Sequence, residues 1–422
     1  MNRDLSVGHM TRDLSVSRRF VTASALLGSA ALLFGAGGPA HAGARATAVA
    51  PVADDVVLRL PAPTGRHLVG CRSVHLVDTS RPDPLTPAFP VRELMLTVFY
   101  PARDVTGLAR APQLPPLAAG LFGQIAPWGP LQVPAAGVAW GATLSHSYAG
   151  AAVLPGRRPV LVYSPGGGDP RGWGTCLAED LASHGAVVVA VDHPGDAAAV
   201  EFPDVTPYRP DPVRPTVLRG DPRDRPALWR TLIDTRIADL HFVLDRLRHA
   251  SALPLPDGLA RVLDLRRVGV YGHSAGGSAV SQVLFENRLV RAAVNLEGYL
   301  DHPPTGPGGP GGAGAPFPIV SAGTDRPVLL LGSEEFDRRR ELDRSWSALA
   351  ARSPRWVRSG RIPHAGHWVF TDFAAALPQL QAAGLMTAEQ RNAVIGPVGP
   401  DVSVPEVRRT VRRFFTRHLA AP

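Results

Sequence analysis

The chain has 422 residues, of which 45% are hydrophobic and 19% charged, so it is long enough for one large α/β domain or two small ones. Its formal net charge is +8, and all 44 basic residues are arginine because the sequence holds no lysine. The arginines are scattered and often lie near aspartate, as at 221–225. A nucleic-acid-binding surface gathers its basic residues into a stripe or patch. We therefore expect no nucleic-acid partner.

The N-terminus has the layout of an export signal. Ser17-Arg18-Arg19-Phe20 precedes a mildly apolar run at 21–36, and Ala40-His41-Ala42 follows. A charged region, an apolar region and a small-residue cleavage site are typical of a signal peptide, and the paired arginines favour the twin-arginine type. The run is too short and too polar for a membrane anchor. We expect residues 1–42 to be removed and the mature protein to be secreted. Arg-Asp-Leu-Ser-Val occurs twice around Met10, so translation from Met10 is an alternative to Met1.

After a polar lead at 43–65, residues 66–422 have the pattern of a single α/β domain. Alternating stretches at 67–78 and 93–100 predict two antiparallel strands. Short apolar runs then alternate with helical stretches, which predicts a mostly parallel sheet with helices on both faces. These further strands are expected at 159–164, 186–191, 267–271, 292–296, 328–331 and 356–361, and the helices at 176–184, 228–248, 275–286, 340–351 and 404–418. Loop insertions are expected near 101–158, 203–225 and 301–324, the first beside the core as part of a substrate cover.

The sequence contains two cysteines, Cys71 and Cys176. One pair at long separation is no disulfide framework, so the free and the bridged states both stay open. Neither cysteine is expected to be catalytic.

A nucleophile is indicated by Gly272-His273-Ser274-Ala275-Gly276, which matches G-x-S-x-G. The β-rich run 268–271 leads directly into it and a helical stretch follows, which is the strand–turn–helix context of the nucleophile elbow in α/β-hydrolases. The glycines are needed because the serine lies in a strained turn packed against neighbouring backbone. The helix N-terminus adds partial positive charge beside the reacting centre.

A serine hydroxyl needs a base, and the base needs an acid to orient it; in this fold the acid precedes the histidine along the chain. The base candidates are His367 and His364, and we prefer His367 because Gly366 permits a sharp turn before it. For the acid we prefer Glu297, which ends an expected strand and precedes a glycine. The alternatives follow the next expected strand in a charged run typical of a solvated helix start; they are Glu334, Glu335 and Asp337.

The oxyanion that forms during ester cleavage needs two backbone N–H groups. One is expected from Ala275. The other is expected from Ser164-Pro165-Gly166-Gly167-Gly168-Asp169, which resembles the glycine-rich oxyanion loops of lipases and esterases. We assign Gly167, with Gly168 as the neighbouring alternative. No Lys-Ser/Thr follows these glycines, so a phosphate-binding loop is disfavoured.

With these residues in place, positions 66–419 resemble the plasma (type II) platelet-activating factor acetylhydrolase family and its bacterial relatives. The resemblance rests on the stretch 92–102, Tyr163-Ser164-Pro165-Gly166-Gly167-Gly168, the stretch 181–193, Gly272-His273-Ser274-Ala275-Gly276-Gly277 and His367-Trp368-Val369-Phe370-Thr371-Asp372-Phe373. It implies His367 as the base, because the family's catalytic histidine opens a similar segment ending in Phe-x-Asp-Phe. It implies Glu297 as the acid, although the family usually has Asp there. The family often carries a bulkier residue where Gly167 stands, which implies a more open pocket.

The resulting expectation is a secreted carboxylic-ester hydrolase of the α/β-hydrolase fold that works through an acyl-enzyme without cofactor or metal. The resemblance implies short-acyl esters or phospholipids with a short or oxidised acyl chain, and transient contact with a lipid surface. A secreted lipase or polyesterase of other acyl preference is one alternative. A non-catalytic binding protein on the same scaffold is the other. We interpret Asp192, His193 and Asp196 as loop structure, and Arg236 and Asp239 as an ion pair on one helix.

Overall fold

The computed structural model of the protein describes residues 55–126, 129, 131–304 and 314–421. All of them belong to one structural unit, Arg45–Pro422. The expected signal peptide at 1–42 lies outside the described residues. Among the helices that the structure describes, none is long and apolar enough to cross a membrane.

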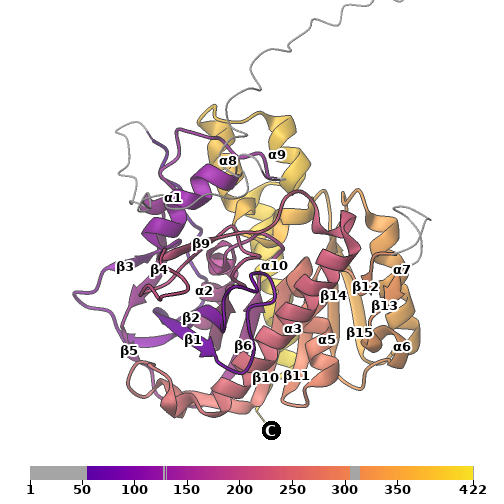
Figure 1. The fold of residues 1–422 in the computed structure, drawn as a ribbon, viewed down its shortest axis with the longest axis horizontal. Coiled ribbons are helices and arrows are strands. Elements are labelled where there is room, and N and C mark those ends of the chain that lie inside the picture. The colour runs from indigo at the N-terminus through magenta and orange to yellow at the C-terminus, as the bar shows by residue number, and fades with distance from the viewer. Residues whose placement is uncertain (1–54, 127–128, 130, 305–313, 422) are drawn as a thin grey trace, which may run out of the picture. The chain divides into compact units, whose positions relative to one another are not determined.

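Eleven strands form the main sheet, in the order β15-β14-β11-β10-β6-β7-β2-β1-β4-β3, with β5 paired to β2 (Figure 1). Strands β7, β6, β10, β11, β14 and β15 are parallel to one another, and β2 is antiparallel to both β7 and β1. This mostly parallel sheet with antiparallel N-terminal strands confirms the predicted fold class. The strands are β1 (Leu68–Asp78), β2 (Arg92–Asp104), β3 (Arg110–Pro112), β4 (Leu144–Ala149), β5 (Ala152–Val153), β6 (Arg158–Ser164), β7 (Val187–Val191), β10 (Leu263–His273), β11 (Val290–Leu296), β14 (Val328–Ser333) and β15 (Val357–Ile362).

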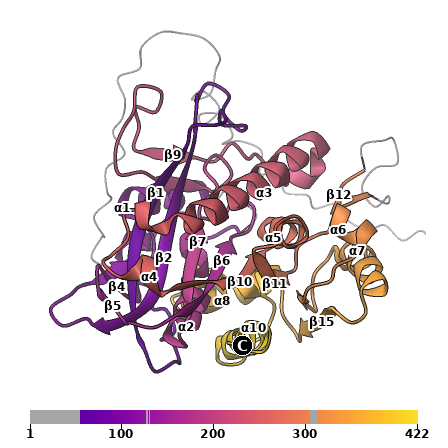
Figure 2. The same ribbon diagram turned by 90° about the horizontal axis from the view of Figure 1, so that it is seen from below.

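Helices cover both faces of this sheet. Figure 2 shows α3 and α5 on one face and α2 and α10 on the other. The α-helices are α1 (Pro116–Ile125), α2 (Thr175–Ser183), α3 (Pro226–Arg248), α4 (Leu259–Val262), α5 (Ala275–Glu286), α6 (Pro318–Ala322), α7 (Arg339–Arg352), α8 (Phe373–Ala382), α9 (Ala388–Ile395) and α10 (Pro400–His418). Short helices are η2 (Trp140–Ala142), η3 (Arg171–Gly174), η4 (Pro222–Asp224), η5 (Ala250–Ala252) and η6 (His367–Phe370), and two small hairpins pair β8 (Ala199–Glu201) with β9 (Val213–Pro215) and β12 (Asp301–His302) with β13 (Ala315–Pro316).

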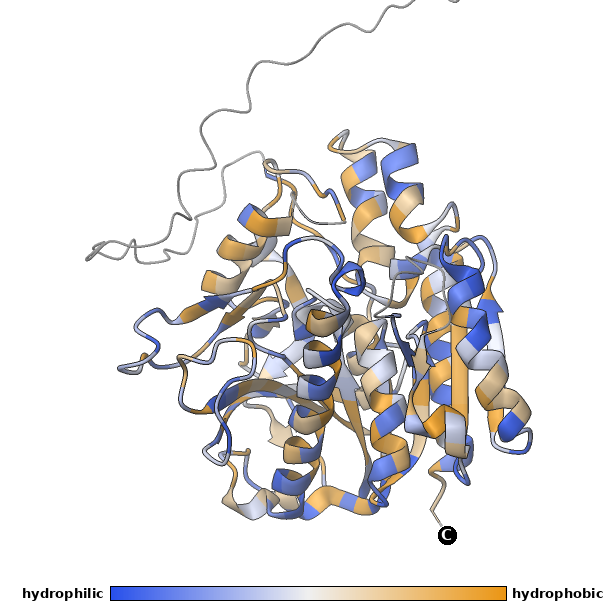
Figure 3. Ribbon diagram, turned by 45° about the vertical axis from the view of Figure 1, so that its right-hand side comes forward, coloured by the Kyte–Doolittle hydropathy of each residue, from blue (hydrophilic) through white to orange (hydrophobic). Residues whose placement is uncertain are grey.

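The core divides between the two faces of the sheet because successive strand residues point to opposite sides. In β7, Val187 and Val189 pack in the cluster that includes α3 and α5, whereas Val188 and Ala190 pack in the cluster that includes α2 and α10. Both sets are buried, which explains why the parallel strands are continuously apolar in the sequence. Figure 3 shows this apolar colouring in the strands, while the helices alternate hydrophobic and hydrophilic residues.

The segment 101–158, expected as an insertion beside the core, contributes to the sheet itself. It forms β3, β4 and β5 at and near the sheet edge, together with α1. Strand β4 buries Ser145 and Ser147 where a strand usually buries apolar side chains. Its sequence therefore lacks the hydrophobic alternation by which strands are recognised. The helices α8 and α9 were also not expected from the sequence.

Candidate active site

Ser274 occupies the turn between β10 and α5. Its φ of 51° and ψ of −120° lie in a region that residues with a side chain rarely adopt, and such strain costs about 1–3 kcal/mol. The Ser274 amide donates to the carbonyl oxygen of Leu296, the last residue of neighbouring β11, at 2.8 Å. Strand β10 therefore delivers the serine to the carboxyl edge of the sheet, where β11 also ends.

Two glycines let the backbone pack closely around Ser274. A Cβ on Gly276 would lie 2.0 Å from the carbonyl oxygen of Ser164 and 2.5 Å from that of Pro165. A Cβ on Gly272 would lie 2.4 Å from the carbonyl carbon of Gly276. Backbone atoms cannot yield as a flexible side chain can. A side chain at Gly276 would therefore separate the elbow from the loop after β6, and one at Gly272 would push β10 away from the first turn of α5.

His367 and Glu297 form a hydrogen-bonded pair. His367 begins η6, and its Nδ1 lies 2.9 Å from Oε2 of Glu297, which directly follows β11. Burial raises the pKa of the fully buried Glu297 carboxyl, but the hydrogen bonds from His367 and Ser333 and the charge of His367 outweigh it and hold that pKa below its ordinary value. An ionised carboxylate at Nδ1 favours the tautomer with its proton there and leaves Nε2 free to accept one.

The neighbouring backbone brings His367 to the serine turn. His273, which precedes Ser274, bonds the carbonyl oxygen of His367 through Nε2 at 3.0 Å, and the two imidazole centroids lie 4.6 Å apart. The His367 ring also stacks on Phe336, with centroids 4.7 Å apart and planes 16° from parallel. The described residues show no hydrogen bond between Ser274 Oγ and His367. Such bonds are often long in enzymes without substrate and tighten when it binds.

The alternative acid and base candidates lie away from this pair. Glu334, Glu335 and Asp337 are exposed, and the His364 side chain is 74% exposed. Glu334 accepts a hydrogen bond from the His364 amide at 2.7 Å. Across the described part of the chain, no hydrogen bond joins any of these four side chains to Ser274 or His367. The structure thus brings together the preferred acid and base rather than their alternatives.

The loop after β6 places Gly167 beside the elbow. A Cβ on Gly167 would lie 3.8 Å from the Cβ of Ala275. The Gly168 amide is occupied, because it donates to Oδ1 of Asp196 at 2.9 Å, whereas the Gly167 amide has no acceptor among the described residues. Ala275 is the first residue of α5, where amide groups lack intrahelical acceptors. The amides of Gly167 and Ala275 are therefore available to an oxyanion, and that of Gly168 is not.

Sequence reasoning missed the residues that hold Glu297. Oε1 of this carboxylate accepts from the Ser333 amide at 2.6 Å and from Arg339 Nη2 at 2.7 Å. Ser333 ends β14, and a polar residue at the carboxyl end of a buried strand was a usable signal. Arg339 lies in the charged run that was interpreted as a solvated helix start, so its sequence context concealed its role.

The expected ion pair between Arg236 and Asp239 is wrong. Arg236 binds Asp196 at 2.6 Å, and Asp239 binds Arg92 at 2.7 Å. Both arginines are fully buried, and residues three apart on one helix are not obliged to pair when buried loops offer other partners.

The described residues contain neither a metal-binding cluster nor an exposed cysteine. Within the described residues, no group of three or more His, Cys, Asp and Glu side chains is placed to hold a metal ion. Cys71 and Cys176 are both free and buried, and burial raises the pKa of the Cys71 thiol to about 12.

The sheet order, the strained serine at the end of a central strand and the histidine-bonded carboxylate at the end of the next are the architecture of α/β-hydrolases. A solved structure agrees: ferulic acid esterase from Streptomyces cinnamoneus is similar at a TM-score of 0.64 and 33% identity, over 87% of this chain and 97% of that one. The protein is a serine ester hydrolase of this fold.

Two further comparisons show which esterases the chain is similar to. Residues 53–203 match the model of the family "Platelet-activating factor acetylhydrolase, isoform II". The protein named "Probable 1-alkyl-2-acetylglycerophosphocholine esterase" of Arthroderma benhamiae is 27% identical over 381 residues, which span 84% of this chain and 87% of that one. The platelet-activating factor acetylhydrolase of Cavia porcellus is 25% identical over 42% of this chain and 40% of its own length. The chain hydrolyses esters and is similar to the platelet-activating factor acetylhydrolase isoform II family, whose model matches residues 53–203.

Proposed function

We propose that the protein is a secreted esterase that cleaves short-acyl carboxylic esters through an acyl-enzyme on Ser274. The observation that carries this proposal is the 2.9 Å bond between His367 and the buried Glu297, next to a serine held at positive φ. A binding protein has no need of this pair or of the strained turn.

The proposed reaction has two halves. Ser274 Oγ attacks the ester carbonyl carbon while His367 Nε2 takes the hydroxyl proton, and the Gly167 and Ala275 amides stabilise the oxyanion. The C–O bond to the alcohol then breaks, and His367 gives its proton to the departing alkoxide. Water repeats the sequence on the acyl-enzyme and releases the carboxylic acid and free serine. Glu297 stays ionised and stabilises the imidazolium that forms in each half.

The relatives suggest two acyl classes. The Arthroderma benhamiae protein is named as a probable 1-alkyl-2-acetylglycerophosphocholine esterase, and the Cavia porcellus protein as a platelet-activating factor acetylhydrolase. The Streptomyces cinnamoneus enzyme is named for ferulic acid, and it matches 87% of this chain at 33% identity. Gly167 leaves the space beside Ala275 without a side chain, which favours access for either acyl group. We place acetyl and other short-acyl esters first and aromatic acid esters second.

A substrate panel tests this assignment. Turnover of p-nitrophenyl esters from C2 to C12, methyl ferulate and an acetylated alkylglycerophosphocholine should be measured with the mature protein and with Ser274→Ala. We expect the highest kcat/KM for C2 to C4 esters and loss of turnover in Ser274→Ala. Ser321→Ala, at an exposed position, is the matched control and should retain full turnover. Preference for C8 and longer esters would favour the lipase, and absent turnover of every ester would favour the binding protein.

We propose secretion because residues 1–42 have the sequence pattern of a twin-arginine export signal. Replacing Arg18 and Arg19 together by lysine should keep the precursor inside a host that has twin-arginine export. Equal amounts of mature protein in the medium from both versions would contradict that route.

A further inference from the structure

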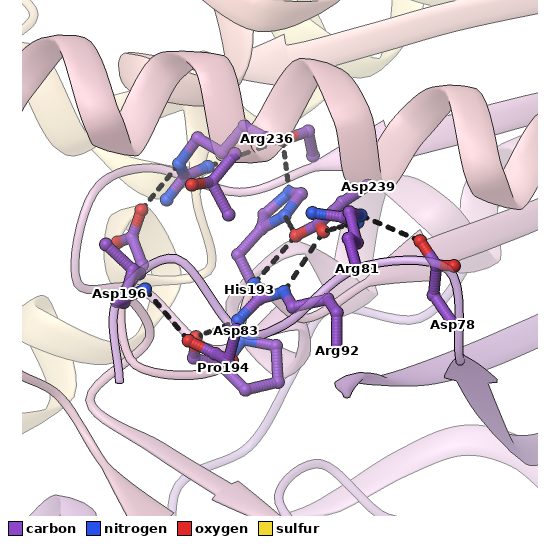
Figure 4. A network of polar contacts seen from close by, with 12 residues as sticks. Asp78, Arg81, Asp83, Arg92, His193, Pro194, Asp196, Arg236 and Asp239 are labelled. Atoms are coloured by element: carbon purple, nitrogen blue, oxygen red, sulfur yellow. Dashed lines mark hydrogen bonds and ion pairs between the residues drawn. The ribbon is translucent and has the colours of Figure 1, made fainter. Parts of the chain in front are cut away.

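The loop that carries Gly167 is held from behind by a buried arginine. Figure 4 shows Arg236 on α3 facing Asp196 of the loop after β7. The Arg236 guanidinium is fully buried and donates to the carbonyl oxygens of Pro165 at 2.6 Å and Gly166 at 2.9 Å. It also donates to Oδ2 of Asp196 at 2.6 Å. One side chain therefore fixes two successive peptide groups before Gly167 and binds a carboxylate as well.

Asp196 holds the same loop on the far side of Gly167. Its Oδ1 accepts the Gly168 amide at 2.9 Å, and Gly168 has a φ of 82° that favours glycine. The carbonyls before Gly167 and the amide after it are thus all bonded, while the Gly167 amide itself is left without an acceptor among the described residues. The bonds on either side therefore fix the direction in which the free N–H group of Gly167 points.

The start of the loop is tied down by Ser164, His193 and Asp239. The Ser164 hydroxyl lies 2.9 Å from Nε2 of His193, whose Nδ1 lies 2.8 Å from Asp239. Burial and the charge of Arg236 lower the pKa of His193, which favours a neutral ring; its bond to the Asp239 carboxylate places the proton on Nδ1, so that Nε2 accepts from Ser164. The bonding resembles that of a catalytic triad, but all three side chains are fully buried. Without access to substrate, this trio anchors the loop rather than reacts.

Charges further out complete the network. Arg92 binds Asp239 at 2.7 Å and Asp83 at 2.6 Å, and Arg81 binds Asp239 at 2.6 Å (Figure 4). Buried ion pairs of this kind contribute little net stability, since apolar residues of similar volume often fold at least as stably. What they supply is a fixed geometry, because a misplaced partner leaves a buried charge unpaired.

We propose that Arg236 and Asp196 are positioning residues of the oxyanion hole. They fix the peptide groups on both sides of Gly167 so that its amide meets the charge that develops on the ester carbonyl oxygen. The inference rests on the proposed function, because it requires Ser274 to be the nucleophile and Gly167 to be an oxyanion donor. Neither residue touches the substrate.

The test compares three variants with a matched control. Arg236→Lys weakens the hydrogen bonds from this side chain to the Pro165 and Gly166 carbonyls and to Asp196, and Arg236→Met removes them. Asp196→Asn keeps an acceptor for the Gly168 amide but loses the charge that binds Arg236. The control is Arg326→Lys, because Arg326 is also buried and also donates to main-chain carbonyls, those of Asn287, Val290 and Phe285, at the opposite end of the strands. Melting temperature and circular dichroism establish which variants fold.

The readouts are kcat and KM for p-nitrophenyl acetate and the inhibition constant of an alkyl trifluoromethyl ketone. That ketone adds to the serine and places an oxyanion in the hole, so its affinity reports the hole directly. Loss of a single oxyanion donor costs about 100- to 1,000-fold in kcat. For a misplaced donor we expect kcat to fall about 10- to 100-fold in Arg236→Lys and Asp196→Asn, with KM changed less than about threefold. Arg236→Met should fall further than Arg236→Lys, and ketone affinity should fall in proportion to kcat/KM.

Variants that fold with lower stability but keep the wild-type kcat and ketone affinity would overturn the inference. So would an equal loss in Arg326→Lys. If Arg236→Met does not fold, Arg236→Lys and Asp196→Asn still decide the outcome. Failure of the proposed function has a different signature, because Ser274→Ala would then retain turnover whatever the other variants do.

Discussion

Glu179 should make the folded protein less stable as the pH rises through neutrality. This residue of α2 is fully buried; its Oε1 accepts from the Ser147 hydroxyl, and its Oε2 has no hydrogen-bond partner. Burial, together with the nearby Asp372, raises the pKa of Glu179 to about 7 from an ordinary 4.5, against the opposing hydrogen bond from Ser147. The perturbation we choose is Glu179→Gln, which keeps the shape and removes the ionisation.

The sign follows from proton binding. Between pH 4.5 and about 7 the folded protein holds a proton on Glu179 that the unfolded chain has lost, so the free energy of unfolding falls as pH rises. The slope is about 1.4 kcal/mol per pH unit, and over this interval it amounts to about 3 kcal/mol. Below pH 4.5 both states are protonated and nothing is lost. Glu179→Gln should therefore gain about 3 kcal/mol relative to wild type between pH 5 and pH 8.

Equilibrium urea denaturation of wild type and Glu179→Gln at pH 5, 6, 7 and 8 measures this difference. Any effect of the amide itself cancels when one pH is compared with another. Glu335→Gln, at an exposed position, is the control and should show the same difference from wild type at each pH. A constant difference between wild type and Glu179→Gln from pH 5 to pH 8 would refute the reasoning.

Three further predictions concern the active site, each measured as kcat/KM for p-nitrophenyl acetate. Glu297→Gln should lower it about 1,000- to 10,000-fold, whereas Asp337→Asn should change it less than about twofold, and the reverse order would reassign the acid. His367→Ala should lower it about 10,000-fold or more while His364→Ala leaves it near wild type, and equal losses would contradict the choice of base. Gly276→Ala should lower it at least about tenfold and destabilise the fold by about 1–3 kcal/mol, since its Cβ would lie 2.0 Å from a carbonyl oxygen; a silent variant would show that the elbow tolerates separation from the loop after β6.

Most of the fold could be predicted from the sequence because the central parallel strands are short, continuous apolar runs. The expected helix at 275–286 is observed as α5 with the same bounds, and the strand 292–296 is observed as β11 from Val290 to Leu296. Continuous apolar runs occur where a strand is buried on both faces, and their short length and β-branched residues distinguish them from buried helices. Strand β4 was not predicted from the sequence because it buries serines. Helix α8 was not predicted because its alanine-rich run with an internal Pro378 has no clear helical pattern of apolar residues.

The candidate site could be predicted where the signal lies in residues that are neighbours in the sequence. Ser274 was predicted from its own neighbours. His367 was preferred because Gly366 precedes it, and Glu297 because it ends an expected strand before a glycine; the family resemblance implied both. The supporting contacts were not predicted, because Arg236 reaches the loop after β6 from about seventy positions away in the sequence, and Arg339 reaches Glu297 from about forty. Side-chain contacts between distant segments leave no periodic signal, so only coordinates reveal them.

Labelling of the purified mature protein with a fluorophosphonate tests the central claim most directly, because only an activated serine reacts quickly with such a probe. Peptide mass mapping should find one adduct, on Ser274, that appears in step with the loss of esterase turnover and is absent from Ser274→Ala. An adduct on another residue, or full turnover after complete labelling of Ser274, would contradict the assignment of this serine as the nucleophile.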